Sequence, residues 1–98
     1  MFEIIQSDDF KAWHDGLRDK IARARVSARI RLAELGNLGD WKPLRNGVSE
    51  MRIDVGPGYR LYFTRRGTIV VVLLCGGDKS KQDTDIKRAI DLAKLWKE

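Results

Sequence analysis

Two segments in the middle of the chain alternate between apolar and polar residues, over 50–55 and again over 59–64. Successive side chains of a strand point to opposite faces, so each segment predicts a strand with one buried face. Gly56-Pro57-Gly58 lies between them and predicts a three-residue hairpin loop. A loop of that length sets a register in which Val55 faces Tyr59.

That register also arranges the polar face of the hairpin. Asp54 would lie opposite Arg60, and Arg52 would lie opposite Tyr62. Two interpretations stay open. The four side chains form an ion pair and a cation–aromatic contact of the kind common on open sheets, or the arginines bind an anion such as an RNA phosphate.

The remaining pattern predicts one α+β domain over residues 1–98. Ser7 before two aspartates is typical of a helix N-cap. The seven-residue apolar run Ile69–Cys75 does not alternate, as in a strand covered on both faces. The predicted elements are a strand over 2–6, a helix from Ser7 to a break at Gly16, a helix over 17–35, a loop over 37–48, a three-stranded meander, and a last helix beginning near Ser80 or Asp83 with a capping box between those two residues.

The helix over 17–35 carries two apolar stripes on roughly opposite sides. One consists of Leu17, Ile21, Ala24, Ala28, Leu32 and Leu35, and the other of Ala22, Val26, Ile30 and Ala33. We expect one stripe to meet the sheet. The second stripe, with Val26 and Ile30 at its centre, either packs on a neighbouring helix or binds a partner protein.

Charge and composition narrow the function classes. Residues 17–66 carry twelve basic and five acidic side chains in a chain of net charge +5, which favours a polyanion such as RNA or DNA, or an acidic protein segment, as partner. The longest apolar run is too short to cross a membrane, and Met1–Gln6 does not resemble a secretory signal. With Cys75 as the only cysteine, we expect a cytoplasmic protein without disulfides.

The sequence gives little indication of a metal site or of a catalytic serine or cysteine. His14 is the only histidine and no carboxylates have metal-ligand spacing, so we expect no metal and no cofactor. A Ser-His-Asp or Cys-His arrangement would need that same histidine. The segment 76–80 contains two glycines, a lysine and a serine, but not at the spacing of a phosphate-binding loop.

Two motifs carry a family resemblance: Gly56-Pro57-Gly58-Tyr59-Arg60 and Gly76-Gly77-Asp78-Lys79-Ser80. With the segment 47–53, they make nearly the whole chain similar to the RelE/ParE superfamily of bacterial toxins, and most closely to its HigB-like "addiction module killer" branch. The resemblance implies a compact RelE-like fold, with two N-terminal helices packed on an antiparallel sheet. For the RelE and HigB branches it also implies metal-independent cleavage of mRNA on the ribosome, and so inhibition of translation.

The resemblance also assigns residues. Arg52, Arg60 and Lys79 match basic residues of RelE-like enzymes, and we expect them to hold the scissile phosphate. Asp54 falls where RelE has a second lysine, and Asp85 falls near its catalytic tyrosine. Arginine is a poor proton acceptor, so the general base stays open among Lys79, Asp78, Asp83, Asp85 and Tyr62. We expect further RNA contacts from Lys42, Arg45, Tyr62, Arg65 and Arg66.

The implied partners are a cognate antitoxin with a helix-turn-helix, the ribosome with its mRNA, and operator DNA bound through the antitoxin. Val26 and Ile30 are the expected antitoxin contacts. Because the ParE branch shares the fold, a non-nuclease inhibitor of DNA gyrase remains an alternative. A binding module that acts only with antitoxin and operator DNA is another.

Overall fold

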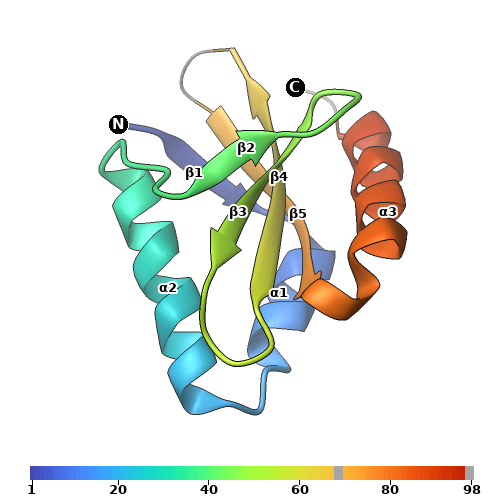
Figure 1. Ribbon diagram of the computed structural model, residues 1–98. Coiled ribbons are helices and arrows are strands. Elements are labelled where there is room, and N and C mark those ends of the chain that lie inside the picture. The colour runs from blue at the N-terminus through green and yellow to red at the C-terminus, as the bar shows by residue number, and fades with distance from the viewer. Residues whose placement is uncertain (68–69, 97–98) are drawn as a thin grey trace.

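A five-stranded sheet with helices on both faces forms the protein in the computed structural model, which describes residues 1–67 and 70–96 (Figure 1). The elements are β1 (Glu3–Gln6), α1 (Asp8–Asp15), α2 (Lys20–Glu34), β2 (Trp41–Pro43), β3 (Val48–Ile53), β4 (Tyr59–Arg66), β5 (Val70–Asp78), a 3-10 turn (Lys79–Lys81) and α3 (Gln82–Leu95). The predicted α+β class is confirmed. No helix of the described residues is long and apolar enough to span a membrane.

The sheet has the order β1-β5-β4-β3-β2 and is mixed rather than antiparallel. β1 runs parallel to β5, with Ile4 opposite Val71, while the other pairs are antiparallel. A parallel pair needs a long crossover, and here α1, α2 and the intervening strands provide it. The predicted loop over 37–48 contains the short edge strand β2, which has too few residues to show a period.

The β3–β4 hairpin differs in register from the prediction. Ile53, not Val55, lies opposite Tyr59. Val55 leaves the ladder because it begins a turn closed by a 3.0 Å hydrogen bond from the Gly58 N–H to its carbonyl oxygen. The slip is two residues, so every side chain keeps its predicted face.

Two apolar clusters fill the space between the sheet and the helices. Phe10, Val26 and Phe63 lie in the cluster beneath α1 and α2, while Val72 and Leu74 lie in the cluster beneath α3. β5 contributes to both, which confirms the strand covered on two faces. The β4–β5 ladder is irregular where Tyr62 faces Cys75 and Phe63 faces Leu73, so Leu74 is an extra residue in β5. Thr68 and Ile69, where a turn and the start of this strand were predicted, lie outside the described residues.

α2 buries Ala22, Val26, Ile30 and Ala33 against the sheet. The prediction that Val26 and Ile30 receive a partner is therefore wrong, because Val26 is 0% and Ile30 8% exposed. The small residues of this stripe let the helix approach the strands closely, and the stripe with the larger side chains faces outward. Gly36, at φ +97°, ends the helix, and the Asn37 N–H donates to the Leu32 carbonyl.

Both ends of the α1 segment show the predicted signals. The Ser7 hydroxyl accepts a 3.0 Å hydrogen bond from the Phe10 N–H and donates to the Leu74 carbonyl at 2.6 Å, which fixes the start of α1 to β5. Gly16 ends α1.

The capping box predicted between Ser80 and Asp83 does not form, because α3 begins at Gln82 without a side-chain cap.

Candidate functional site

β3 and β4 place Arg52 directly opposite Arg60 on the face of the sheet that α3 partly covers. Like charges opposed across a strand pair repel each other. Each guanidinium has its own carboxylate: Arg52 Nη2 lies 2.8 Å from Asp40 Oδ1, and Arg60 Nε lies 3.8 Å from Glu50 Oε1. The expected pair of Asp54 with Arg60 is not formed, because the register is shifted.

Arg52 is held from the loop before β2. Its Nε and Nη2 both donate to Asp40, and its backbone N–H donates to the Asp40 carbonyl. The hydrogen bond from Arg52 holds the pKa of the Asp40 carboxyl below its ordinary value. Arg29 of α2 donates to the backbone carbonyls of Leu38, Asp40 and Arg52, which fixes this loop on the end of β3.

Glu50 joins three elements beneath Arg60. Its side chain is 1% exposed, and it accepts a 3.2 Å hydrogen bond from Gln82 of α3. Lys42 Nζ of β2 lies 3.9 Å from its other oxygen. The sequence analysis missed this role, because an acidic residue in an alternating strand is usually on the solvent side.

The three predicted catalytic cations line one cavity of about 370 Å³ at the end of the hairpin. Lys79 is brought there by a 2.8 Å hydrogen bond from its N–H to the Gly58 carbonyl. We call this the arginine cavity; its lining residues are Asp40, Arg52, Ile53, Asp54, Gly56, Pro57, Gly58, Arg60 and Lys79. The structure thus brings Arg52, Arg60 and Lys79 together, and their catalytic role stays a prediction.

The residues predicted to contact RNA do not form one surface. Tyr62 is fully buried, and its phenol has a pKa raised first by that burial, so the prediction that it contacts RNA is wrong. Arg66 donates to the carbonyls of Ala93 and Trp96 at the end of α3. Arg45 and Arg65 line a separate cavity of about 180 Å³ at the opposite end of the hairpin. Lys42 alone lies beside the Glu50–Arg60 pair.

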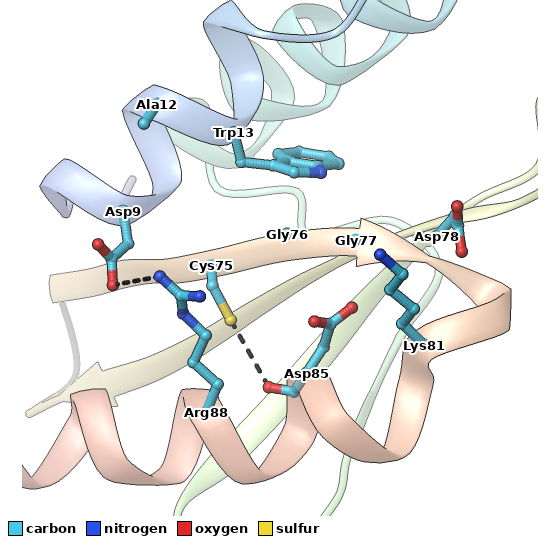
Figure 2. Close-up of a pocket in the computed structure, with 10 residues that line it drawn as sticks. All are labelled: Asp9, Ala12, Trp13, Cys75, Gly76, Gly77, Asp78, Lys81, Asp85 and Arg88. Carbon is cyan, nitrogen blue, oxygen red and sulfur yellow. Dashed lines mark hydrogen bonds and ion pairs between the residues drawn. The ribbon is translucent and has the colours of Figure 1, made fainter.

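A second cavity, of about 460 Å³, opens between α1 and α3 along the edge of β5 (Figure 2). Its lining residues are Asp9, Ala12, Trp13, Cys75, Gly76, Gly77, Asp78, Lys81, Asp85 and Arg88, and none of them lines the arginine cavity. Asp78 and Asp85 therefore line the second cavity and not the arginine cavity, although Asp78 directly precedes Lys79 in the chain. Of the general bases proposed from the sequence, Lys79 lines the arginine cavity. Asp54 also lines it and is a further candidate base.

The side chains of this second cavity explain the glycine pair. The Trp13 ring covers Gly76 on one face of β5, and the Asp85 carboxyl covers Gly77 on the other (Figure 2). A Cβ at either glycine would overlap the side chain above it. Burial raises the pKa of the Asp85 carboxyl, and raises that of the Cys75 thiol to about 12. Gly76-Gly77 thus makes room for packing.

Three charged side chains that line this cavity, Asp9, Asp78 and Arg88, form ion pairs or hydrogen bonds within the fold. Arg88 of α3 lies 3.1 Å from Asp9 of α1, an ion pair that joins the two helices across β5 (Figure 2). Asp78 accepts from the backbone and the hydroxyl of Ser80, and these hydrogen bonds lower the pKa of its carboxyl. Within the described residues no three His, Cys, Asp or Glu side chains are grouped to hold a metal ion.

Two comparisons relate this chain to known proteins. The family model described as phage derived protein Gp49-like (DUF891) matches residues 8–97, which include every residue of the arginine cavity. An uncharacterized protein of Haemophilus influenzae is 48% identical over 84 residues, which cover 86% of this chain and 85% of that protein.

Proposed function

This chain belongs to the Gp49-like family of phage-derived proteins, a family related to RelE- and HigB-like toxins, and we propose that it is the toxin of a type II toxin-antitoxin pair. In this proposal it is a ribosome-dependent mRNA endoribonuclease, and the arginine cavity is its catalytic site. Within the superfamily, we propose that the chain is related to the HigB-like branch, which its sequence motifs resemble.

One observation carries the proposal: Arg52 and Arg60 are opposed across the strands in a cavity that also holds Lys79. Opposed like charges destabilise a sheet; Asp40 and Glu50 each offset one of these charges, but both arginines still line one cavity with Lys79. A phosphodiester bound between them would remove the repulsion. Arginine suits this task because its planar guanidinium can donate two parallel hydrogen bonds to phosphate oxygens.

The two arginines would also promote cleavage of the RNA by its own 2'-hydroxyl group. The 2'-oxygen attacks phosphorus, the bond to the 5'-oxygen breaks, and the products are a 2',3'-cyclic phosphate and a 5'-hydroxyl. Negative charge builds up on the phosphoryl oxygens during the attack, and fixed cations stabilise it. Arg52 and Arg60 supply these cations in our proposal.

Two side chains of the cavity handle the protons. Asp54 lines the cavity and makes no ion pair with any described residue, in contrast to Asp40. We assign to Asp54 the acceptance of the 2'-hydroxyl proton, and to Lys79 the donation of a proton to the leaving 5'-oxygen. Loss of the acidic limb of the pH–rate profile in Asp54→Asn, and of the basic limb in Lys79→Ala, would test these roles.

The proposal includes a cognate antitoxin that carries a helix-turn-helix and binds operator DNA. The relation of the family to toxins supports this partner. A short neighbouring reading frame with a helix-turn-helix pattern would support the pair, and co-expression of its product should restore growth.

Primer extension on cellular mRNA after induction tests the nuclease directly. New 5' ends within translated codons should appear with the wild-type chain and with Lys87→Ala, an exposed lysine on α3, but not with Arg52→Ala, whose side chain is 39% exposed. Growth arrest without new 5' ends would contradict the nuclease. Inhibition of supercoiling by gyrase in the same cells would then favour the ParE-like alternative.

A further inference from the structure

The outer face of α2 carries an apolar stripe that is open to solvent. Ile21 and Leu35 are each 66% exposed and Leu32 is 40% exposed, with exposed Ala24 and Ala28 between them. Within the described part of the chain, five large apolar side chains are exposed, and three of them lie on this stripe. Contiguous exposed apolar surface of this kind marks interaction sites.

The stripe has the shape of a helix-binding seam. Its residues are Ile21, Ala24, Ala28, Leu32 and Leu35, which follow one another at intervals of three, four, four and three residues, the spacing of helix–helix packing. The alanines at its centre leave a groove of about 540 Å³, bordered by Leu32, Leu35 and Arg31. A second helix would place its apolar side chains in that groove.

Charge identifies the occupant. Arg25 and Arg31 are exposed and flank the stripe on its two sides, and α2 contains one acidic residue, Glu34. The flanks therefore attract carboxylates. A helix with an apolar stripe and Asp or Glu on both flanks would be complementary in shape and in charge.

A second copy of this chain fits the shape of the seam but not its charge. The spacing is symmetric about Ala28, so antiparallel pairing could put Ile21 of one copy against Leu35 of the other. A two-fold contact repeats every residue, however. Arg25 and Arg31 of both copies would then gather around one seam, where like charges repel.

We propose that the outer face of α2 binds an acidic amphipathic helix of a partner protein. The stripe shares no residue with the arginine cavity, so this inference goes beyond the proposed ribonuclease. Val26 and Ile30, where the sequence predicted that a partner contacts this helix, are core residues. The proposed contact surface of α2 is the exposed stripe instead.

A synthetic peptide tests the surface with the full chain. The probe is a labelled helical peptide with Leu at its core positions and Glu on both flanks, and its matched control has Lys in place of every Glu. Fluorescence anisotropy should show binding of the acidic peptide at low salt, weakened by added salt. The Lys peptide should bind at least about tenfold more weakly.

Variants locate the contact. Leu32→Glu with Leu35→Glu should weaken binding of the acidic peptide by at least about tenfold, and so should Ala28→Glu, which fills the groove and repels the acidic peptide. Leu95→Glu, at a residue of α3 that is 78% exposed, is the matched control and should bind normally. Circular dichroism should show the same fold in all variants, because all these positions are exposed.

Three results would overturn the inference. The stripe variants could bind the acidic peptide as the wild type does, or the acidic and basic peptides could bind equally. The chain could also sediment as a dimer that Ala28→Arg makes monomeric, and the surface would then belong to a second copy. Peptide binding without any nuclease activity would contradict only the proposed function.

Discussion

Arg60 lies over a carboxylate that is itself buried: its Nε is 3.8 Å from Glu50 Oε1, and the two side chains are 15% and 1% exposed. Gln82 and Lys42 contact the same carboxylate. Glu50 therefore attracts the Arg60 guanidinium, which lines the arginine cavity. It also balances one of the two opposed arginine charges, so the pair connects the stability of the sheet with the geometry of the site.

The first prediction concerns the stability of this pair. Arg60→Ala should lower the free energy of unfolding by roughly 2–3 kcal/mol, because it removes one partner of a buried charge while Lys42 and Gln82 remain. Glu50→Gln in the same chain should restore most of the loss. Urea unfolding of the two single variants and the double variant measures the coupling, and additive effects would show that the two side chains do not interact.

The second prediction concerns the carboxylate on Arg52. Asp40→Asn should increase affinity for a single-stranded RNA oligonucleotide by a factor of a few, because it releases Arg52 and removes a negative charge from the cavity. Asp9→Asn is the matched control, since Asp9 pairs with Arg88 outside this cavity. Fluorescence anisotropy at two salt concentrations compares them, and an equal gain in both variants would show only an effect of net charge.

The faces of the hairpin could be predicted from the sequence, but its register could not. Side chains of a strand alternate between its two faces, so a register shift of two residues leaves Arg52, Arg60 and Tyr62 on the same face. The turn hydrogen bond that removes Val55 from the ladder depends on the local geometry of Gly56 and Gly58, which the pattern does not contain. The opposition of the two arginines was therefore not predicted.

The sequence pattern also could not predict that side chains on the second face of the sheet are buried. Alternation in β3 indicates that one face is covered, but not that α3 also covers the other. Glu50 and Tyr62 consequently looked accessible and are buried. On α2 both stripes are apolar, and the small side chains around Val26 rather than the larger Ile21 and Leu35 fit against the strands.

The third prediction tests which side of α2 is core. Val26→Asp should abolish cooperative unfolding, because an unpaired carboxylate at a position that is 0% exposed is strongly unfavourable. Leu32→Asp should leave the melting temperature within a few degrees. Thermal unfolding followed by circular dichroism compares the two, and the reverse order of stability would contradict the burial of α2 described above.

The fourth prediction concerns the glycine under Asp85. Gly77→Ala should lower the free energy of unfolding by about 1–3 kcal/mol, because the added methyl group overlaps the Asp85 carboxyl. Asp85→Ala in the same chain should recover most of this loss. Chemical denaturation measures both, and a Gly77→Ala chain as stable as the wild type would show that the carboxyl is free to move away.

The fifth prediction is a dependence on pH. Burial raises the pKa of Asp85 above its ordinary value of 3.8, so the folded chain binds this proton more readily than the unfolded chain does. Its contribution to stability is therefore greatest below pH 3.8 and falls as the pH rises through the raised pKa. The melting temperature of Asp85→Asn relative to that of the wild type should therefore increase as the pH rises above 3.8; a difference that does not change with pH would contradict the prediction.

Cleavage of mRNA on purified, programmed ribosomes in a single turnover tests the central claim most directly. The wild-type chain and Lys87→Ala should cleave at the same rate and leave a 2',3'-cyclic phosphate, whereas Lys79→Ala and Arg52→Ala should each be slower by about 100-fold or more. Equal rates in all four chains would contradict the assignment of catalysis to the arginine cavity, and intact mRNA with the wild-type chain would contradict the ribonuclease itself.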